Sequence, residues 1–131
     1  TKTVLKGNIG IGTDNPGSWE LAVDGKIKTK EVKVTIEGWS DFVFYEDYQL
    51  PTLNEVEKHI KEKGHLKDIP SAEKVKQEGF FLGEMDAKLL QKIEELTLYT
   101  IQQQKELDQE KKKNTNLEAR LAKLEELFLK E

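Results

Sequence analysis

The residues of this chain that could do chemistry are few and widely spaced. The chain has no cysteine, which excludes disulfides and thiolate chemistry. His59 and His65 stand six positions apart with no third ligand at a metal-binding spacing. We expect His59 on a solvated helix face and His65 in a turn. "GNIGIGT", residues 7–13, is rich in glycine, but it lacks the Gly-Lys-Ser/Thr ending of a phosphate loop. Neither a metal nor another cofactor is therefore expected.

Ser40 and Asp41, in "EGWSDF", form a pair that could support nucleophilic chemistry. A serine nucleophile needs a base to take its proton, and no lysine occurs between Lys33 and Lys58. The base would have to be a residue distant in sequence, or a residue of another subunit. The simpler interpretation is that Ser40 caps a turn or a helix together with Asp41.

Composition limits the class of protein. The 131 residues are 36% hydrophobic and 35% charged, with a formal net charge of -4. This balance lacks the basic footprint of a nucleic-acid binder. No apolar run approaches the roughly 20 residues of a membrane span, so membrane insertion is not expected. Thr1 is not an initiator methionine, and we expect it to begin a fragment.

The first segment, residues 1–36, has the composition of β structure. Glycines and an Asn-Pro-Gly signal mark turns in residues 7–17. In "LAVDGKI", Asp24-Gly25 lies between two apolar stretches, which predicts a two-residue hairpin. So few apolar residues cannot close a core alone, and the segment therefore needs partners.

The second segment, residues 37–83, is predicted to be a small α-rich knot with an aromatic core. Thr52 and Glu55 form a capping box before a helix that stops at Gly64. Ser71 and Gly79 bound a second short helix in the same way. The expected buried face of the first helix consists of Leu53, Val56 and Ile60, and the expected aromatic core of Trp39, Phe42, Phe44, Tyr45, Tyr48, Phe80 and Phe81.

The third segment, residues 84–131, is predicted to be one helix about 70 Å long. A break near residues 113–116 would give a helical hairpin instead, but that stretch has no glycine or proline. Apolar residues follow a heptad whose a and d positions cannot be covered by the small knot. An oligomeric coiled coil follows, with two or three strands left open by these residues. The predicted interface consists of Leu89, Ile93, Leu96, Thr100, Gln103, Leu107, Asn114, Leu117, Leu121, Leu124 and Phe128.

The sequence also resembles a known kind of module. "GNIGIGTDNPGSWELAVDGKIKTKEVKV" resembles the β unit near the ends of bacterial surface fibres and phage tail fibres. The stretch from "DFVFYEDYQL" to "IQQQKEL", with "HLKDIPSA" and "LLQKIEELTLY" inside it, is similar to the C-terminal module of secreted or cell-surface proteins of Bacteroidetes-type bacteria. That module is in turn similar to the intramolecular chaperone domains of endosialidase-type tailspikes.

The resemblance implies an α+β, extracellular homotrimer. A short β end of a fibre shaft, a small α-rich knot and a parallel trimeric coiled coil would follow one another, and the module would cap the fibre and bring its chains into register. Several tailspike chaperones also cut themselves at a serine assisted by a lysine, and Ser40 stands at the corresponding junction. The basic cluster that usually follows is replaced here by "FVFYEDY". The first alternative to the assembly function is an adhesive fibre tip whose aromatics bind a receptor or glycan, and self-cleavage at Ser40 is the second.

Overall fold

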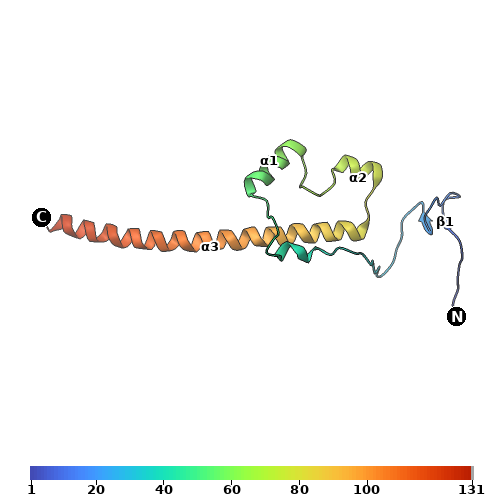
Figure 1. Ribbon diagram of the computed structural model, residues 1–131, viewed down its shortest axis with the longest axis horizontal. Coiled ribbons are helices and arrows are strands. Elements are labelled where there is room, and N and C mark those ends of the chain that lie inside the picture. Colours follow the sequence, from blue (N-terminus) through green and yellow to red (C-terminus); the bar gives the residue numbers. More distant parts are fainter. Residues whose placement is uncertain (131) are drawn as a thin grey trace. The chain divides into compact units, whose positions relative to one another are not determined.

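The chain is dominated by helices and carries one small sheet (Figure 1). The structure is a computed structural model that describes residues 1–130. The elements follow in the order β1 (Ile9–Ile11), β2 (Leu21–Val23), the 3-10 helix η1 (Ser40–Phe44), α1 (Leu53–Lys63), α2 (Ala72–Glu78) and α3 (Leu82–Leu129). The chain divides into two compact units, Thr1–Lys33 and Val34–Glu131.

The first unit is built around a parallel pair of three-residue strands. Ile9 of β1 lies opposite Leu21 of β2, and Ile11 lies opposite Val23. The loop between the strands is held by Asn15, whose Oδ1 accepts from the Gly17 amide at 3.2 Å. Gly12 has φ +74°, and a Cβ there would lie 2.9 Å from the Asp24 carbonyl oxygen. Only glycine combines that backbone angle with so close an approach.

The predicted hairpin at Asp24-Gly25 is wrong. β2 pairs in parallel with β1, which precedes it in the chain, through a crossover loop. Residues 24–33 contain no strand. The Asp24 amide donates to the Ile11 carbonyl at 2.9 Å, so this residue extends the parallel pairing and does not begin a turn. Asp-Gly is a local signal for a tight turn, whereas the partner of β2 lies about a dozen residues upstream. The turn signal was outweighed by that more distant pairing.

In the second unit, the two short helices have the predicted ends. The Thr52 hydroxyl accepts from the Glu55 amide at 3.3 Å, and the Glu55 carboxylate accepts from the Thr52 amide at 2.8 Å. This reciprocal capping box begins α1, and Gly64 ends it in the left-handed region at φ 76°. Ser71 caps α2 through the Lys74 amide, and Gly79 ends it. Both predictions are confirmed.

α3 is one continuous helix of 48 residues, so the hairpin alternative for its middle is wrong. Its single glycine, Gly83, lies where the chain before η1 crosses its first turn. A Cβ at this position would collide with the Ile36 side chain and lie 2.7 Å from the Val34 side chain. The glycine therefore lets this apolar pair pack directly on the helix backbone.

The expected aromatic core does not form within one chain. Val43, 1% exposed, is the only apolar side chain among the described residues that is buried. Trp39, Phe44 and Tyr45 are all largely exposed, as are Leu53 and Ile60 of the face expected to be buried on α1. Burial of apolar surface is the main source of folding free energy. A chain that buries so little of it has left most of its stabilising contacts unmade.

Candidate oligomer interface

The a and d positions in the first half of α3 form an apolar strip that no part of the chain covers. We call this strip, together with its continuation to the end of α3, the seam. Ile93 is 59% exposed and Leu96 is 63% exposed, and Leu89 is similarly open. The polar residues Thr100 and Gln103 hold the next a and d positions and are also exposed. Isolated apolar side chains on a surface are ordinary, but a contiguous strip is typical of an interaction site.

The opposite face of α3 is covered. We call the b, c and f positions between residues 87 and 98 the back face, namely Ala87, Lys88, Gln91, Glu94, Glu95 and Leu98. All six are buried or half-buried, and η1 is the element whose backbone packs there. The chain therefore covers a largely polar face of its long helix and leaves the apolar face in water. This inverts the usual arrangement of an amphipathic helix.

A hydrogen-bond network fixes the chain after η1 to the back face. The Tyr48 hydroxyl donates to Glu95 Oε1 at 2.5 Å, and Gln91 Nε2 donates to the same oxygen at 2.9 Å. Lys92 Nζ lies 3.0 Å from Glu95 Oε2 and 3.7 Å from the Asp68 carboxylate. Glu95 is only 6% exposed. Its buried charge is thus satisfied by three donors, as buried carboxylates require.

The network shifts the titration of both its acidic groups. Burial raises the pKa of Tyr48 to about 12, with the hydrogen bond to Glu95 adding to the shift. Burial by itself raises the pKa of Glu95, but the hydrogen bonds from Tyr48, Lys92 and Gln91 together hold that pKa below its ordinary value. The native fold therefore favours a neutral Tyr48 beside an ionised Glu95.

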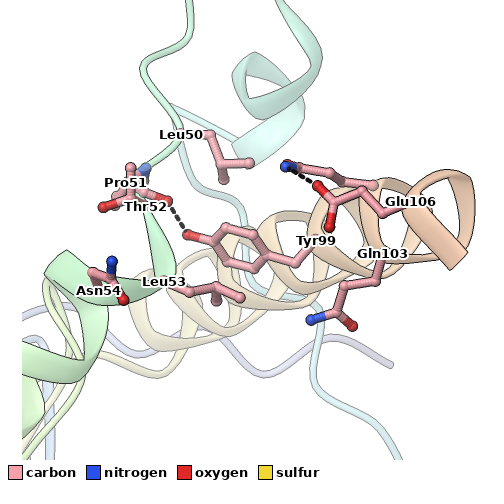
Figure 2. Close-up of a pocket in the computed structure, with 9 residues that line it drawn as sticks. Leu50, Pro51, Thr52, Leu53, Asn54, Tyr99, Gln103 and Glu106 are labelled. Atoms are coloured by element: carbon pink, nitrogen blue, oxygen red, sulfur yellow. Dashed lines mark hydrogen bonds between the residues drawn. The ribbon is translucent and has the colours of Figure 1, made fainter. Parts of the chain in front are cut away.

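The segment that holds α1 and α2, residues 50–79, is tied to α3 by few contacts. We call it the arm. No Cα atom of α1 or α2 lies within 8 Å of a Cα atom of another helix or strand in the described chain. The Tyr99 hydroxyl donates to the Pro51 carbonyl at 2.5 Å and holds the start of the arm (Figure 2). Leu53 lies beside the Tyr99 ring in a cavity of about 300 Å³.

A second cavity of about 300 Å³ separates α1 from α3 around His59. The expectation that His59 lies on a solvated face is wrong, because the residue is half-buried and its Nε2 is covered, with no hydrogen-bond partner within residues 1–130. Its ring meets that of His65 edge to face, with centroids 5.7 Å apart. The prediction failed because Leu66 and Lys92 also line this cavity, and neither is close to His59 in sequence.

Ser40 does not cap η1, so that interpretation is wrong. Trp39 occupies the N-cap position, and no side chain caps the helix. Ser40 is 1% exposed, and its Oγ has no hydrogen-bond partner among the described residues. It borders a cavity of about 320 Å³ that is also lined by Glu84 and Lys88 of α3. The structure thus brings a lysine 48 positions away in sequence to the same cavity, which no local pattern could have indicated.

The predicted interface continues along the second half of α3. Asn114, Leu117, Leu121, Leu124 and Phe128 lie on one continuous helix, and all are exposed. Leu107, which joins the two halves, is exposed as well. All eleven predicted interface residues are therefore open to a partner. The residues of the back-face network were not predicted, because Tyr48 and Glu95 are 47 positions apart.

The remaining kinds of site give no competing candidate. Within residues 1–130, no group of three or more His, Asp or Glu side chains is placed to hold a metal ion. No described helix has both the length and the apolar character that crossing a bilayer requires. Comparison with protein-family models, with curated proteins and with solved structures finds no match to this chain.

Proposed function

We propose that the chain is an assembly module: a trimerising C-terminal cap, and the intramolecular folding chaperone, of an extracellular fibre protein. One observation carries this proposal. The chain covers the largely polar back face of α3 and leaves exposed the whole heptad seam, which is apolar toward both ends of the helix and polar at Thr100, Gln103 and Asn114 in its middle. An exposed heptad seam is buried most simply by other copies of the same seam in a parallel coiled coil. Three strands are proposed here because the sequence resembles trimeric fibre modules.

The first unit supports the same proposal. A parallel sheet is normally covered on both faces, whereas Ile11 and Leu21 of the two paired strands are exposed. Two three-residue strands are also too short to be stable alone. The first unit, Thr1–Lys33, which we call the β unit, therefore needs neighbouring chains, as the end of an intertwined fibre shaft would.

The chaperone role follows from the difference in contact range. Interchain β contacts are non-local, so they form slowly and expose strand edges until they are made. Coiled-coil contacts are local along each helix and form quickly. Joining the chains through α3 first raises the effective concentration of the β units. The module would thus act by ordering the sequence of assembly steps, without chemistry.

Sedimentation equilibrium over a wide range of protein concentrations tests the proposal. We expect a single species with three times the 15.1 kDa mass of the chain. A dimer would reassign the seam to two strands, and a folded monomer at micromolar concentration would overturn the proposal altogether. Fluorescence dyes attached near the first and last residues of α3 in mixed trimers would show whether the helices run parallel.

A second candidate function, self-cleavage before Ser40, is favoured by the cavity that Ser40 shares with Lys88. With Lys88 as the base that takes its proton, Ser40 Oγ would attack the Trp39 carbonyl carbon. The peptide C–N bond would then break, giving an ester and a free Ser40 amine. Water would hydrolyse the ester, release the Trp39 carboxylate and restore the hydroxyl. No external substrate has to reach the buried serine, because the attacked carbonyl is its own neighbour.

Mass spectrometry of the refolded protein tests this second candidate. A fragment that begins at Ser40, present in the native chain and absent from Ser40→Ala and Lys88→Met, would establish cleavage. A mass that remains full-length after prolonged incubation of the folded oligomer would remove it. The assembly proposal does not depend on the outcome.

A further inference from the structure

Two sets of exposed apolar side chains lie outside the seam. Ile101 is at a b position of α3, on the side away from a and d, yet it is 46% exposed. Leu53 and Ile60 project from α1 and are exposed to a similar degree. A coiled coil that buried only its a and d positions would leave all three in water. Burying them requires a contact outside the seam.

The position of α1 shows where such a contact would lie. Leu53, its first residue, lines the cavity beside Tyr99, Gln103 and Glu106 (Figure 2). Tyr99 and Glu106 are at g positions and Gln103 is at a d position of the heptad. The cavity therefore lies along the g flank of α3 and borders the seam itself. Its walls come from the arm and from α3 of the same chain, and it is open on the remaining side.

In a parallel coiled coil, the g flank of one helix faces the e flank of the next. Helices in register place equal residue numbers at equal heights. The cavity at residues 99–106 of one copy would therefore face e and b positions of its neighbour at the same height. Those positions are held by Thr97, Ile101 and Gln104. Ile101 is the large apolar side chain among them. Along the axis of α3 it lies level with the cavity that Leu53 lines.

We infer that the first turn of α1 packs against α3 of a neighbouring copy, with Leu53 of one chain against Ile101 of the next. The inference rests on the proposed parallel assembly and deepens it. A second copy is the occupant because the cavity borders the seam through Gln103 and because the exposed groups on the two sides are both apolar. Each chain would give its arm to one neighbour and receive the arm of the other, which closes a ring in a three-fold assembly.

Site-specific cross-linking tests this contact, and the absence of native cysteine gives a clean background. Leu53→Cys and Ile101→Cys chains would be prepared separately, with one of them labelled with heavy nitrogen. They would then be unfolded together, refolded and treated with a short bis-maleimide. We expect a covalent dimer with one labelled and one unlabelled chain. Mixing the two variants excludes a cross-link within one chain, and homodimers of either variant should remain minor.

A third variant separates failure of this contact from failure of the assembly. Ile93→Cys at the seam should cross-link whenever the helices associate, whatever the arm does. A seam cross-link without any product from the mixed pair would overturn the inference and leave the assembly standing. Failure of both cross-links would overturn the assembly and the inference together.

Hydrogen exchange provides an independent measurement on intact oligomers. Ile101→Glu leaves the seam unchanged, so we expect it to remain trimeric while the amides of α1 exchange about tenfold faster, since partly burying an isoleucine is worth about one factor of ten. Lys105→Glu, at an f position on the outside, is the matched control and should leave α1 unchanged. Equal exchange of α1 in native protein and Ile101→Glu would contradict the inference.

Discussion

The two halves of α3 differ in what holds them. The first half, residues 82–106, has η1 packed on its back face. Its Glu95 also accepts a hydrogen bond from the Tyr48 hydroxyl. In the second half, residues 107–129, every side chain is exposed. Its contacts are local, such as the Lys113–Glu110 ion pair at 2.6 Å. The same helix is therefore anchored by its own chain in one half and by nothing but its own turns in the other.

This difference bears on how α3 becomes stable. Isolated helices are marginal in water even when their sequence favours helix, and exposed ion pairs contribute little. The second half carries leucine at four of its seven a and d positions and phenylalanine at a fifth, but no other segment of the described chain packs against it. Its stability as a helix would have to come from other copies. The first half, by contrast, is positioned by its own chain with the seam turned outward.

The largest expected effect comes from the seam of the first half. Replacing Ile93 and Leu96 by lysine removes two apolar layers, and each buried Leu or Ile contributes about 1.5–3 kcal/mol. Six such side chains would be lost in the proposed trimer. We expect monomers or aggregates by sedimentation, with loss of amide protection in residues 9–23 of the β unit. Lysines at Asp108 and Gln109, outside the seam, are the control. A soluble, fully folded monomer that retains its β unit would contradict the proposed assembly.

A smaller effect is expected from the seam of the second half. Lysines at Leu121 and Leu124 should unfold the end of α3, because no other contact holds it. The first half should keep its back-face network, so the protein should still associate, though more weakly. Segment-resolved hydrogen exchange would measure both halves at once, with Ala119→Lys and Ala122→Lys at outer positions as controls. Complete loss of association would show that the two halves act as one cooperative unit, and the comparison would fail.

The seam and the ends of the helices could be predicted from sequence, because they depend on local patterns. The heptad gives the seam, and capping signals at Thr52, Gly64 and Ser71 give the ends of the short helices. Such signals span one or two helical turns, so the residues that carry them are neighbours in any fold. This is also why the continuous α3 was predictable.

The contacts that distinguish the first half were not predictable in the same way. The Tyr48–Glu95 hydrogen bond and the Ser40–Lys88 cavity each join residues almost 50 positions apart, and neither has a local signature. The hairpin prediction for residues 1–36 failed for a related reason, since the pairing of β2 with β1 outweighed the turn signal at Asp24. The heptad pattern predicts which face of α3 is left exposed. It does not predict which segment of the chain covers the back face.

The Tyr48 hydroxyl contacts the first half of α3 alone. Tyr48→Phe removes a hydrogen bond to Glu95, which is buried and ionised. Leaving a buried group short of a partner costs about 1–3 kcal/mol, with charged groups at the upper end. We expect a lower melting temperature and faster exchange in residues 40–48, with the second half unchanged. Tyr45→Phe is the matched control, since Tyr45 is largely exposed. Equal melting of the two variants would show that the network contributes nothing.

The smallest expected effect is a pH dependence confined to the same network. The pKa of Tyr48 is raised from 10.0 to about 12, so the native state holds this proton more tightly than the unfolded chain. The resulting stability is complete below pH 10 and is lost as the pH rises from about 10 to about 12. The pKa of Glu95 is lowered from 4.5, so its contribution is present above that pH and is lost as the pH falls below it.

Thermal melts of native protein and Tyr48→Phe across this range isolate the effect from the titration of lysines, which both proteins share. The difference in stability between them should be greatest at neutral pH and should shrink toward pH 12, because Tyr48 then carries a charge beside Glu95. It should also shrink in acid, where Glu95 becomes protonated and no longer needs the hydroxyl as a donor. A difference that stays constant from pH 4 to pH 12 would mean that the hydroxyl stabilises α3 by packing and not through its proton.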